Sequence, residues 1–164
     1  MFIKNETFSK QTEKYINDAK TLTAYILDNI PVLNHIKLTV SELSENTIKL
    51  TAPLYENRNH YGSAFGGSIA TIGIVAGWAI LTYKIHEEKV PATLVIKNSH
   101  TEYKRPVKDE FSAEVIIKPA EWEQLKSKFA EKGKAGLEVT SRIISRGEIC
   151  AEQKSVYVCI QPAG

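Results

Sequence analysis

The sequence has little cysteine, almost no excess of charge and no tract of low complexity. Its two cysteines, Cys150 and Cys159, are too few for a disulfide framework or a zinc site. We expect them to be small buried side chains in a reducing compartment. Lys and Arg number 21 against 19 Asp and Glu, which leaves a net charge of +2. So small an excess does not indicate nucleic-acid binding, and no nucleic-acid partner is expected.

A secretory signal is also missing. Residues 1–15 carry five charged side chains and no apolar stretch, so we expect a cytoplasmic protein. The 164 residues fit one domain, and apolar and charged fractions of 43% and 24% are ordinary for a globular protein. This composition excludes a disordered chain, a collagen and a coiled coil.

Only one stretch, residues 64–83, imitates a membrane span, because it has no charged side chain and is long enough to cross a bilayer. It contains Gly73 and Gly77 at the four-residue spacing found in contacts between membrane helices. Its many glycine and alanine residues, however, make a thin helix that suits close packing on all sides better than contact with lipid. We therefore predict a buried core helix and no membrane span.

The spacing of apolar residues predicts the remaining elements. An amphipathic helix covers residues 9–30, with Ser9 as its N-cap and Pro31 beyond its end. The glycine-rich helix begins at Gly66 or Gly67 and ends near Glu87, and a short charged helix lies within residues 121–134. Strands are predicted over residues 36–43, 47–52, 93–103, 111–117, 137–144 and 149–160.

This order indicates an α+β fold in which an antiparallel sheet of about six strands wraps around one long central helix. We expect a single domain over residues 1–164, with residues 1–24 as an N-terminal helical extension. A roll or an open-faced sandwich would give a similar order of elements. One protomer would leave a face of the helix and a sheet edge uncovered, so we also expect a homodimer.

The loop before the central helix carries a distinctive pattern. It reads Asn57-x-Asn59-x-x-Gly62-Ser63-x-Phe65-x-Gly67-Ser68, with Ala52-Pro-Leu54 before it and Gly77-Trp78 after it. From about residue 20 to its end the chain resembles the hotdog-fold thioesterase domains of the YiiD C-terminal family. These domains occur in proteobacteria alone or fused C-terminal to a GNAT acetyltransferase, and the resemblance is to a stand-alone member. The stretch Tyr103-Lys-Arg-Pro-Val107 is shared by hotdog proteins generally.

The resemblance implies an enzyme that acts on acyl thioesters of coenzyme A or acyl carrier protein. Phosphopantetheine or coenzyme A would then arrive as part of the substrate, and no separate cofactor or metal is expected. Most family members are labelled thioesterases by inference, and some are understood to decarboxylate malonyl-acyl carrier protein for the start of fatty-acid synthesis. In those the second asparagine of Asn-x-Asn is taken as the key residue, which corresponds to Asn59.

The residues themselves suggest how charge would be stabilised. Gly66, Gly67 and Ser68 would present unpaired backbone N–H groups at the positive end of the helix dipole. Together with the side-chain amide of Asn59, these groups could stabilise negative charge on a thioester oxygen. Asn59, Gly67 and Ser68 are therefore the predicted catalytic residues. The alternatives are a simple capped helix, and turn chemistry for Asn57 and Asn59.

A general base is hard to find. Hydrolysis of a thioester usually needs a base or a nucleophile, yet residues 54–83 hold one carboxylate, Glu56. His60 is the one nearby side chain that titrates near neutral pH, and a place at a dimer interface explains it equally well. Decarboxylation of a malonyl thioester needs no base, so we favour it over hydrolysis. A non-catalytic acyl-binding module is a second alternative.

Substrate contacts are predicted in the loop and in two basic groups. The anionic phosphates of the carrier, or an acidic carrier protein, would attract the basic groups, although a solvated charged face is the alternative for both. The loop candidates are Asn57, His60, Gly62, Phe65 and Gly66. The basic candidates are Lys104 and Arg105 with Lys108 beside them, and Lys132 and Lys134 with Lys126 and Lys128.

Overall fold

The computed structural model describes the backbone of residues 3–164 and, from residue 10 onward, the side chains as well. Its elements in chain order are α1 (Ile3–Asn29), α2 (Leu33–Ile36), β1 (Thr39–Leu43), β2 (Thr47–Ala52), the 3₁₀ turn η1 (Tyr55–Asn57), α3 (Gly66–Glu87), β3 (Thr93–Tyr103), β4 (Phe111–Ile116), α4 (Pro119–Lys132), β5 (Lys134–Ser145) and β6 (Glu148–Ile160).

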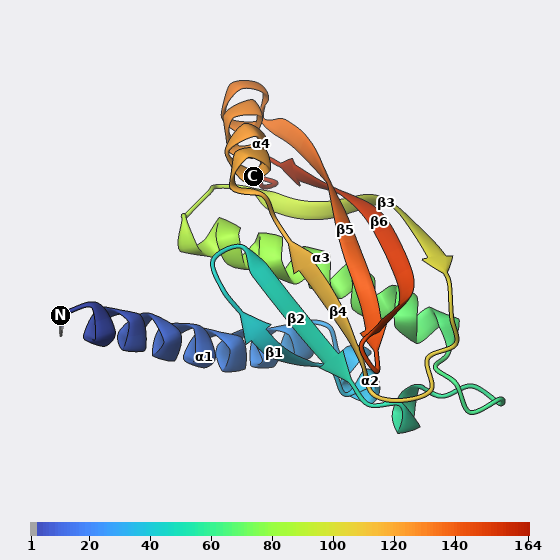
Figure 1. Ribbon diagram of the computed structural model, residues 1–164. Coiled ribbons are helices and arrows are strands. Elements are labelled where there is room, and N and C mark those ends of the chain that lie inside the picture. The colour runs from blue at the N-terminus through green and yellow to red at the C-terminus, as the bar shows by residue number, and fades with distance from the viewer. Residues whose placement is uncertain (1–2) are drawn as a thin grey trace.

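The six strands form one antiparallel sheet in the order β1-β2-β4-β5-β6-β3. The sheet curls around α3, while α1 lies along the side that the sheet leaves open, and the N-terminal end of α1 extends beyond the body of the domain (Figure 1). This arrangement is the hotdog fold, so the predicted fold is confirmed. The two edges of the sheet are β1 and β3.

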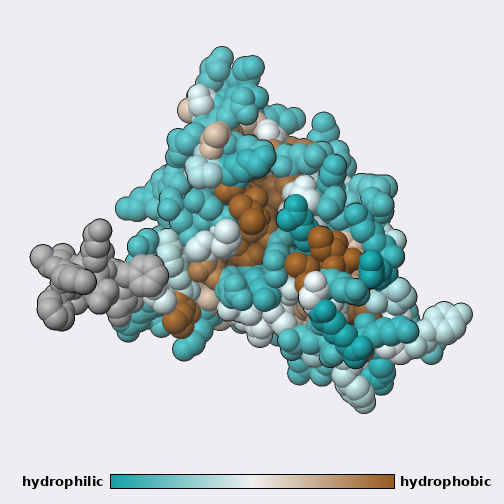
Figure 2. Space-filling model, in the orientation of Figure 1, coloured by the Kyte–Doolittle hydropathy of each residue, from teal (hydrophilic) through white to brown (hydrophobic). Residues whose placement is uncertain are grey.

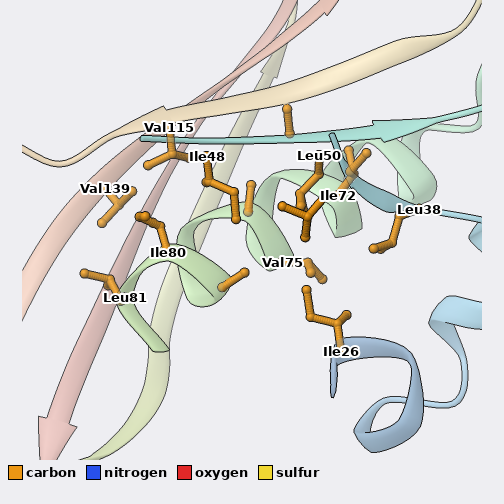
Figure 3. Close-up of a cluster of buried hydrophobic side chains, with 14 of the residues drawn as sticks. Ile26, Leu38, Ile48, Leu50, Ile72, Val75, Ile80, Leu81, Val115 and Val139 are labelled. Carbon is orange, nitrogen blue, oxygen red and sulfur yellow. The ribbon is translucent and has the colours of Figure 1, made fainter. Parts of the chain in front are cut away.

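The core lies between α3 and the inner face of the sheet. Ile72 and Ile80 of α3 are fully buried, and they point toward Ile48 and Leu50 of β2 (Figure 3). Ile26 of α1 approaches α3 from the opposite side (Figure 3). Burying a side chain of this size contributes roughly 1.5–3 kcal/mol, so contacts on both sides hold α3 in place.

The small residues of α3 make room for polar side chains from the sheet. A Cβ atom at Gly73 would lie 2.7 Å from Gln153 Oε1, and one at Gly77 would lie 2.5 Å from Tyr157 Oη. These side chains reach the helix backbone, because Gln153 Nε2 donates to the Ala70 carbonyl at 2.8 Å and Tyr157 Oη donates to the Ile74 carbonyl at 2.6 Å. Burial raises the pKa of Tyr157 to about 12, so its hydroxyl remains a donor at neutral pH.

α3 therefore serves as the core helix of the domain. It has the length and composition of a membrane span, but 61% of its most apolar window is buried inside the protein. The Gly73 and Gly77 spacing, which also occurs in membrane helices, here accommodates side chains of β6. Cys150 and Cys159 are both buried and unpaired, as predicted, and burial raises the pKa of the Cys159 thiol.

Four element boundaries differ from the sequence-based prediction. β5 begins at Lys134, three residues before the predicted start at residue 137. α1 begins at Ile3, so Ser9 lies inside the helix and is not its N-cap; residues 3–8 contain no proline or glycine that would prevent a helix. The predicted strand over residues 36–43 begins only at Thr39, because a short helix ends at Ile36 and Lys37 takes a left-handed conformation (φ 59°). The short charged helix is shifted toward the N-terminus, with Pro119 in its first turn.

Candidate functional site

The loop between β2 and α3 lies at the end of the sheet where β3 also ends, and it projects at the lower right of Figure 1. Backbone bonds hold it together: the Asn59 N–H donates to the Ser63 carbonyl at 2.7 Å, and the Phe65 N–H donates to the Asn57 carbonyl at 2.7 Å. The Ala64 N–H donates to the Val107 carbonyl at 2.8 Å, which ties the loop to the segment after β3. The loop thus has a defined shape without a ligand.

Asn57 lies inside this loop. Its side chain is 2% exposed, and its amide nitrogen donates to the carbonyls of Ile36 at 2.9 Å and Pro53 at 2.8 Å. Both N–H groups of the amide are thereby used by the protein itself. This geometry favours the loop-shaping alternative for Asn57 over direct contact with a substrate.

Asn59 is half-buried and caps the turn that follows it. Its Oδ1 accepts hydrogen bonds from the backbone N–H groups of Tyr61 (2.9 Å) and Ser63 (3.2 Å), and its Nδ2 donates to Ser63 Oγ at 3.1 Å. The second N–H of this amide has no acceptor among the side chains of residues 10–164 or the backbone that the structure describes. Asn59 therefore combines the predicted turn chemistry with one donor that remains available to a ligand.

The first turn of α3 has no side-chain cap. Phe65 occupies the N-cap position, and the first bond of the helix runs from the Ile69 N–H to the Phe65 carbonyl at 3.1 Å. The N–H groups of Gly66, Gly67 and Ser68 precede that bond, so they are the unpaired donors that the sequence predicted. A Cβ atom at Gly67 would lie 2.3 Å from the exposed Phe65 ring, so any larger residue here would require the ring to move.

Tyr103, which the sequence reasoning did not select, touches this helix start. Its hydroxyl donates to the Gly66 carbonyl at 2.8 Å, and its ring lies against the Gly66 backbone. The carbonyl of Gly66 and the N–H of Gly67 belong to one peptide unit, so the tyrosine holds and polarises one of the predicted donors. Its place at the start of the Tyr103-Lys-Arg-Pro-Val107 stretch, which hotdog proteins share, was the signal that could have drawn attention to it.

No carboxylate of α3 lies near its first turn. The helix has its single acidic residue, Glu87, at its last position, which is about 30 Å from Gly66 at 1.5 Å per residue. Glu56 is exposed on η1, and His60 is exposed with its ring against Tyr61 (centroids 3.8 Å apart). Among the side chains that the structure describes, those of residues 10–164, no three His, Cys, Asp or Glu come together to hold a metal ion.

The two basic groups lie at opposite ends of the protomer. Lys104 and Arg105 directly follow β3, and their backbone N–H groups both donate to the Cys150 carbonyl, beside the loop and the start of α3. Arg105 also forms an exposed ion pair with Glu148 at 3.0 Å. Lys132 is at the end of α4 and Lys134 begins β5, at the end of the molecule where α3 terminates.

Lys126 differs from the other lysines of its group because the protein already uses its charge. It pairs with Glu88, just after α3, and with Glu123 at 2.8 Å, while Trp122 Nε1 donates to Glu88 at 2.7 Å. Burial works against the charge of Glu88, but the hydrogen bonds from Lys126 and Trp122 outweigh it and lower the pKa of Glu88. Lys126 therefore fastens α4 to the end of α3.

Comparison with known proteins places this fold and helix start in the class of thioesterase-type hotdog domains. The chain belongs to the family described as "Putative thioesterase (yiiD_Cterm)", whose profile matches residues 19–161.

Solved structures share the fold. The chain superposes on a protein of unknown function from Chlorobaculum tepidum with a TM-score of 0.83 and 23% identity, over 88% of this chain and 94% of that one. A protein of unknown function from Pseudomonas aeruginosa, titled a probable thioesterase, gives a TM-score of 0.79 and 22% identity over 90% and 96% of the two chains. A putative thioesterase from Shewanella oneidensis gives a TM-score of 0.74 and 23% identity, over 87% of this chain and 96% of that one.

Proposed function

We propose that this protein acts on acyl thioesters carried by acyl carrier protein or coenzyme A, and that it decarboxylates a malonyl thioester rather than hydrolysing an acyl thioester. The observation that carries this proposal is the uncapped start of α3, with an available Asn59 N–H nearby and no carboxylate on the first turns of the helix. Such a site supplies donors for an oxyanion but offers no base on that helix to activate water.

The chemistry follows from these donors. When the bond between the malonyl carboxylate carbon and the α-carbon breaks, carbon dioxide leaves and its bonding electrons form a thioester enolate. The N–H groups of Gly67 and Ser68 and the amide of Asn59 stabilise the enolate oxygen. A proton from solvent then adds to the α-carbon, which gives the acetyl thioester. Removing a donor of this kind typically costs 10²–10³ in turnover, which is the scale of the expected effect.

Hydrolysis is the second candidate, because the family is described as thioesterases. It would require a base for water, and His60 is the titratable side chain of the loop. His60 is exposed with its ring against Tyr61, and no hydrogen bond in the described part of the chain orients it for this task. For this reason we place hydrolysis after decarboxylation.

We also propose that the working form is a homodimer joined through β3. This strand is 11 residues long and pairs only with β6, so one complete edge of backbone groups is unpaired. Val95 and Ile96 on it are about two-fifths exposed. Natural proteins rarely leave so long an edge uncovered, and a second copy of the strand would pair with it. Figure 2 shows apolar side chains near the middle of one face, surrounded by polar ones.

One experiment tests the reaction. The purified protein is incubated with malonyl, acetyl and longer acyl thioesters of coenzyme A and of acyl carrier protein, and released carbon dioxide and free thiol are measured separately. Carbon dioxide without thiol from the malonyl substrates supports the proposal. Thiol release without carbon dioxide would assign hydrolysis instead. If a folded protein binds these thioesters but releases neither product, it is a non-catalytic acyl-binding module.

A further inference from the structure

A buried lysine lies near the C-terminal end of α3. Lys84 is 3% exposed, and among the side chains of residues 10–164 it is the one lysine, arginine, aspartate or glutamate that is buried. It lies 18 residues beyond Gly66, or about 27 Å along the helix axis, so it is remote from the predicted catalytic donors. The proposed decarboxylation makes no use of it.

Two neutral acceptors hold the amine of Lys84. Its Nζ donates to the Glu45 carbonyl at 3.0 Å and to Asn46 Oδ1 at 2.8 Å, both in the turn between β1 and β2 (Figure 1). No carboxylate in the described part of the chain forms an ion pair with it. An uncharged amine has two N–H groups and one lone pair, so these two acceptors satisfy it and leave the lone pair free. An ammonium has a third N–H, for which the described residues provide no acceptor.

The surroundings of Lys84 favour this uncharged form. Burial is the largest influence and lowers the pKa of Lys84, and the positive charge of Lys126 on α4 acts in the same direction. The carboxylates of Glu45, Glu88 and Glu123 favour the ammonium but do not outweigh burial. At neutral pH a larger fraction of Lys84 than of an exposed lysine is therefore free amine, which is the nucleophilic form.

The aromatic ring beside Lys84 is shared with another cation. The centroid of the Trp122 ring lies 5.3 Å from the Nζ of Lys84 and 5.7 Å from the Nζ of Lys126. A ring face attracts a cation, but the exposed partner can supply that charge at a smaller cost in desolvation. Trp122 is thus satisfied by Lys126 and does not require a charge on Lys84.

A hollow of about 310 Å³ adjoins Lys84. It lies between α1, the turn between β1 and β2, and the last turns of α3, and Gln11 and Tyr15 line it from α1. Two further charged residues of the lining, Lys14 and Glu87, pair with each other at 2.8 Å and leave Lys84 without a counter-ion. The space is about ten times the roughly 30 Å³ that one water molecule occupies in the liquid, so it has room for a short acyl group.

We infer that Lys84 is an acyl-acceptor site, at which a small acyl thioester converts the amine into an amide. The lone pair of Nζ adds to the thioester carbonyl carbon and a carbon–nitrogen bond forms. The carbon–sulfur bond breaks, and the sulfur leaves as a thiol with the proton that the nitrogen releases. The product is neutral, which suits a place without a counter-ion. An aldehyde suits it less, because the imine that it forms can take up a proton and restore the charge.

The hollow also provides for the amide after it has formed. An amide keeps one N–H, which can donate to the Glu45 carbonyl or to Asn46 Oδ1 but not to both. Its new oxygen needs a donor, and the side chains of Gln11 and Lys14 line the same hollow. Acylation therefore releases one of the two bonds that fasten the β1–β2 turn to α3. We expect a looser turn and an unchanged helix start.

Acylation rates at single lysines test the inference. The protein is incubated at pH 7 with the acetyl thioester of N-acetylcysteamine, a small probe, and peptide mass spectrometry follows each lysine. Lys84 should be acetylated several-fold faster than Lys20, an exposed lysine of α1. This ratio should fall as the pH rises toward 10, because Lys20 then also becomes free amine. Equal rates in the folded protein, or a ratio that does not change with pH, would overturn the inference.

Two variants of α1 test the hollow. Gln11→Trp fills it and leaves both hydrogen bonds of Lys84 in place, so acetylation of Lys84 should slow several-fold. Asn17→Trp, at an exposed position of the same helix outside the hollow, should leave the rate unchanged. Melting curves establish that both variants are folded. A folded Gln11→Trp protein that is acetylated at the wild-type rate would overturn the assignment of the hollow.

Hydrogen exchange measures the consequence for the turn. Backbone N–H groups of residues 44–47 should exchange faster in the acetylated protein than in the untreated one. Lys84→Arg, which keeps donors for the turn but has no free amine, should show the same exchange before and after treatment. Exchange that does not change when residue 84 is acetylated would overturn the predicted loosening of the turn.

Two further results separate this inference from its alternatives. Propionaldehyde with cyanoborohydride is the second reagent, and preferential labelling of Lys84 by it but not by the thioester would overturn the acyl assignment. The inference is also independent of decarboxylation. A protein that acetylates Lys84 but releases no carbon dioxide from malonyl thioesters refutes the proposed function and supports the acceptor site, and the opposite result refutes the site alone.

Discussion

The hydroxyl of Tyr103 donates a 2.8 Å hydrogen bond to the carbonyl of Gly66, the first residue of α3. The bond joins the last residue of an edge strand to the peptide that carries one of the unpaired helix donors. Tyr103 is about half exposed, so its removal leaves no buried polar group. It therefore acts as a positioning residue for the donor rather than as support for the core.

Replacing this tyrosine should affect catalysis more than stability. Tyr103→Phe loses a hydrogen bond worth about 0.5–1.5 kcal/mol, so we expect kcat to fall by roughly two- to tenfold with KM little changed. The melting temperature should stay close to that of the wild type, because the ring remains. Tyr55→Phe, on an exposed ring in η1, is the matched control. A fall in melting temperature without a change in kcat would assign Tyr103 a structural role only.

Two variants are needed at Asn59, because its Oδ1 accepts hydrogen bonds within the loop and its Nδ2 carries the available donor. Asn59→Asp keeps an oxygen that can accept the N–H groups of Tyr61 and Ser63, and it removes the N–H donor. We expect it to reduce malonyl decarboxylation by roughly 10²–10³, since a carboxylate also repels the enolate. Asn59→Ala loses the turn as well and should be no more active.

The Asn59→Asp variant also separates the two reactions. A carboxylate at this position could serve as a base for water, so we expect thiol release to rise where carbon dioxide release falls. Separate assays of the two products measure both changes. Unchanged carbon dioxide release in a folded Asn59→Asp protein would remove Asn59 from the catalytic residues.

Charge reversal should distinguish the two basic groups. Exchanging Lys132 and Lys134 for glutamate should raise KM for the acyl carrier protein substrate and flatten its dependence on salt, with kcat little changed. Exchanging Lys104 and Lys108 for glutamate tests the group at the other end of the protomer in the same way, and the group whose reversal changes KM and its salt dependence is the one that binds the carrier. If the variant at Lys132 and Lys134 has the same kinetics as the wild type at every salt concentration, that group is a solvated face and does not bind the carrier.

Replacing Gly77 even with alanine should destabilise the protein. The added Cβ would meet the Tyr157 hydroxyl at 2.5 Å, and overpacking of this kind costs about 1–3 kcal/mol, more than the gain of up to about 1 kcal/mol in helix propensity. We expect a lower denaturant midpoint for Gly77→Ala. Gly66→Ala, whose Cβ would lie an ordinary 3.5 Å from Tyr103, should unfold like the wild type. Equal midpoints for both variants would contradict the close fit of α3.

An ion-pair cluster should make α1 sensitive to acid. Burial opposes the charge of Asp18, but hydrogen bonds from Lys14 (2.6 Å) and Tyr83 (2.7 Å) outweigh it and hold the pKa of Asp18 below its ordinary 3.8. A carboxyl group whose pKa is lower in the folded state stabilises the protein at pH values above its unfolded-state pKa. This stabilisation is lost as the pH falls through the folded-state pKa.

The difference in stability between wild type and Asp18→Asn should therefore be largest near neutral pH and decrease below about pH 4. Melting curves from pH 7 to pH 3 measure it. Asp28→Asn, an exposed residue of the same helix without an ion pair in the described part of the chain, should show no such trend. A difference that stays constant down to pH 3 would contradict the role of the cluster.

Most of the fold could be predicted because its signals are local. Alternating apolar and polar residues predicted β2, and the glycine-rich run predicted α3 to within a residue. The turn between β5 and β6 contains Gly147, whose φ of 75° lies in the left-handed region that glycine adopts readily. The start of α1 was missed because residues 3–8 contain no proline or glycine that would mark a boundary. The helix α2 was missed because its four residues, Leu33–Ile36, are too few to show a helical period.

Less of the candidate site could be predicted from the sequence. Asn57 and Asn59 look equivalent in the motif, yet one is buried and the other is half exposed. The difference arises from the Ile36 carbonyl, 21 residues away, which accepts from Asn57. The contact of Tyr103 with Gly66 spans 37 residues and likewise depends on the curl of the sheet.

The polar side chains that reach α3 from the sheet also determine how rigid the helix start is. Gln153, Ser141 and Tyr157 bond to the carbonyls of Ala70, Gly73 and Ile74, one turn beyond the unpaired donors. These three bonds oppose sliding or rotation of the helix relative to the sheet. In the proposed reaction the donors are therefore oriented when the chain folds, and little reorganisation is needed when charge develops on the oxygen.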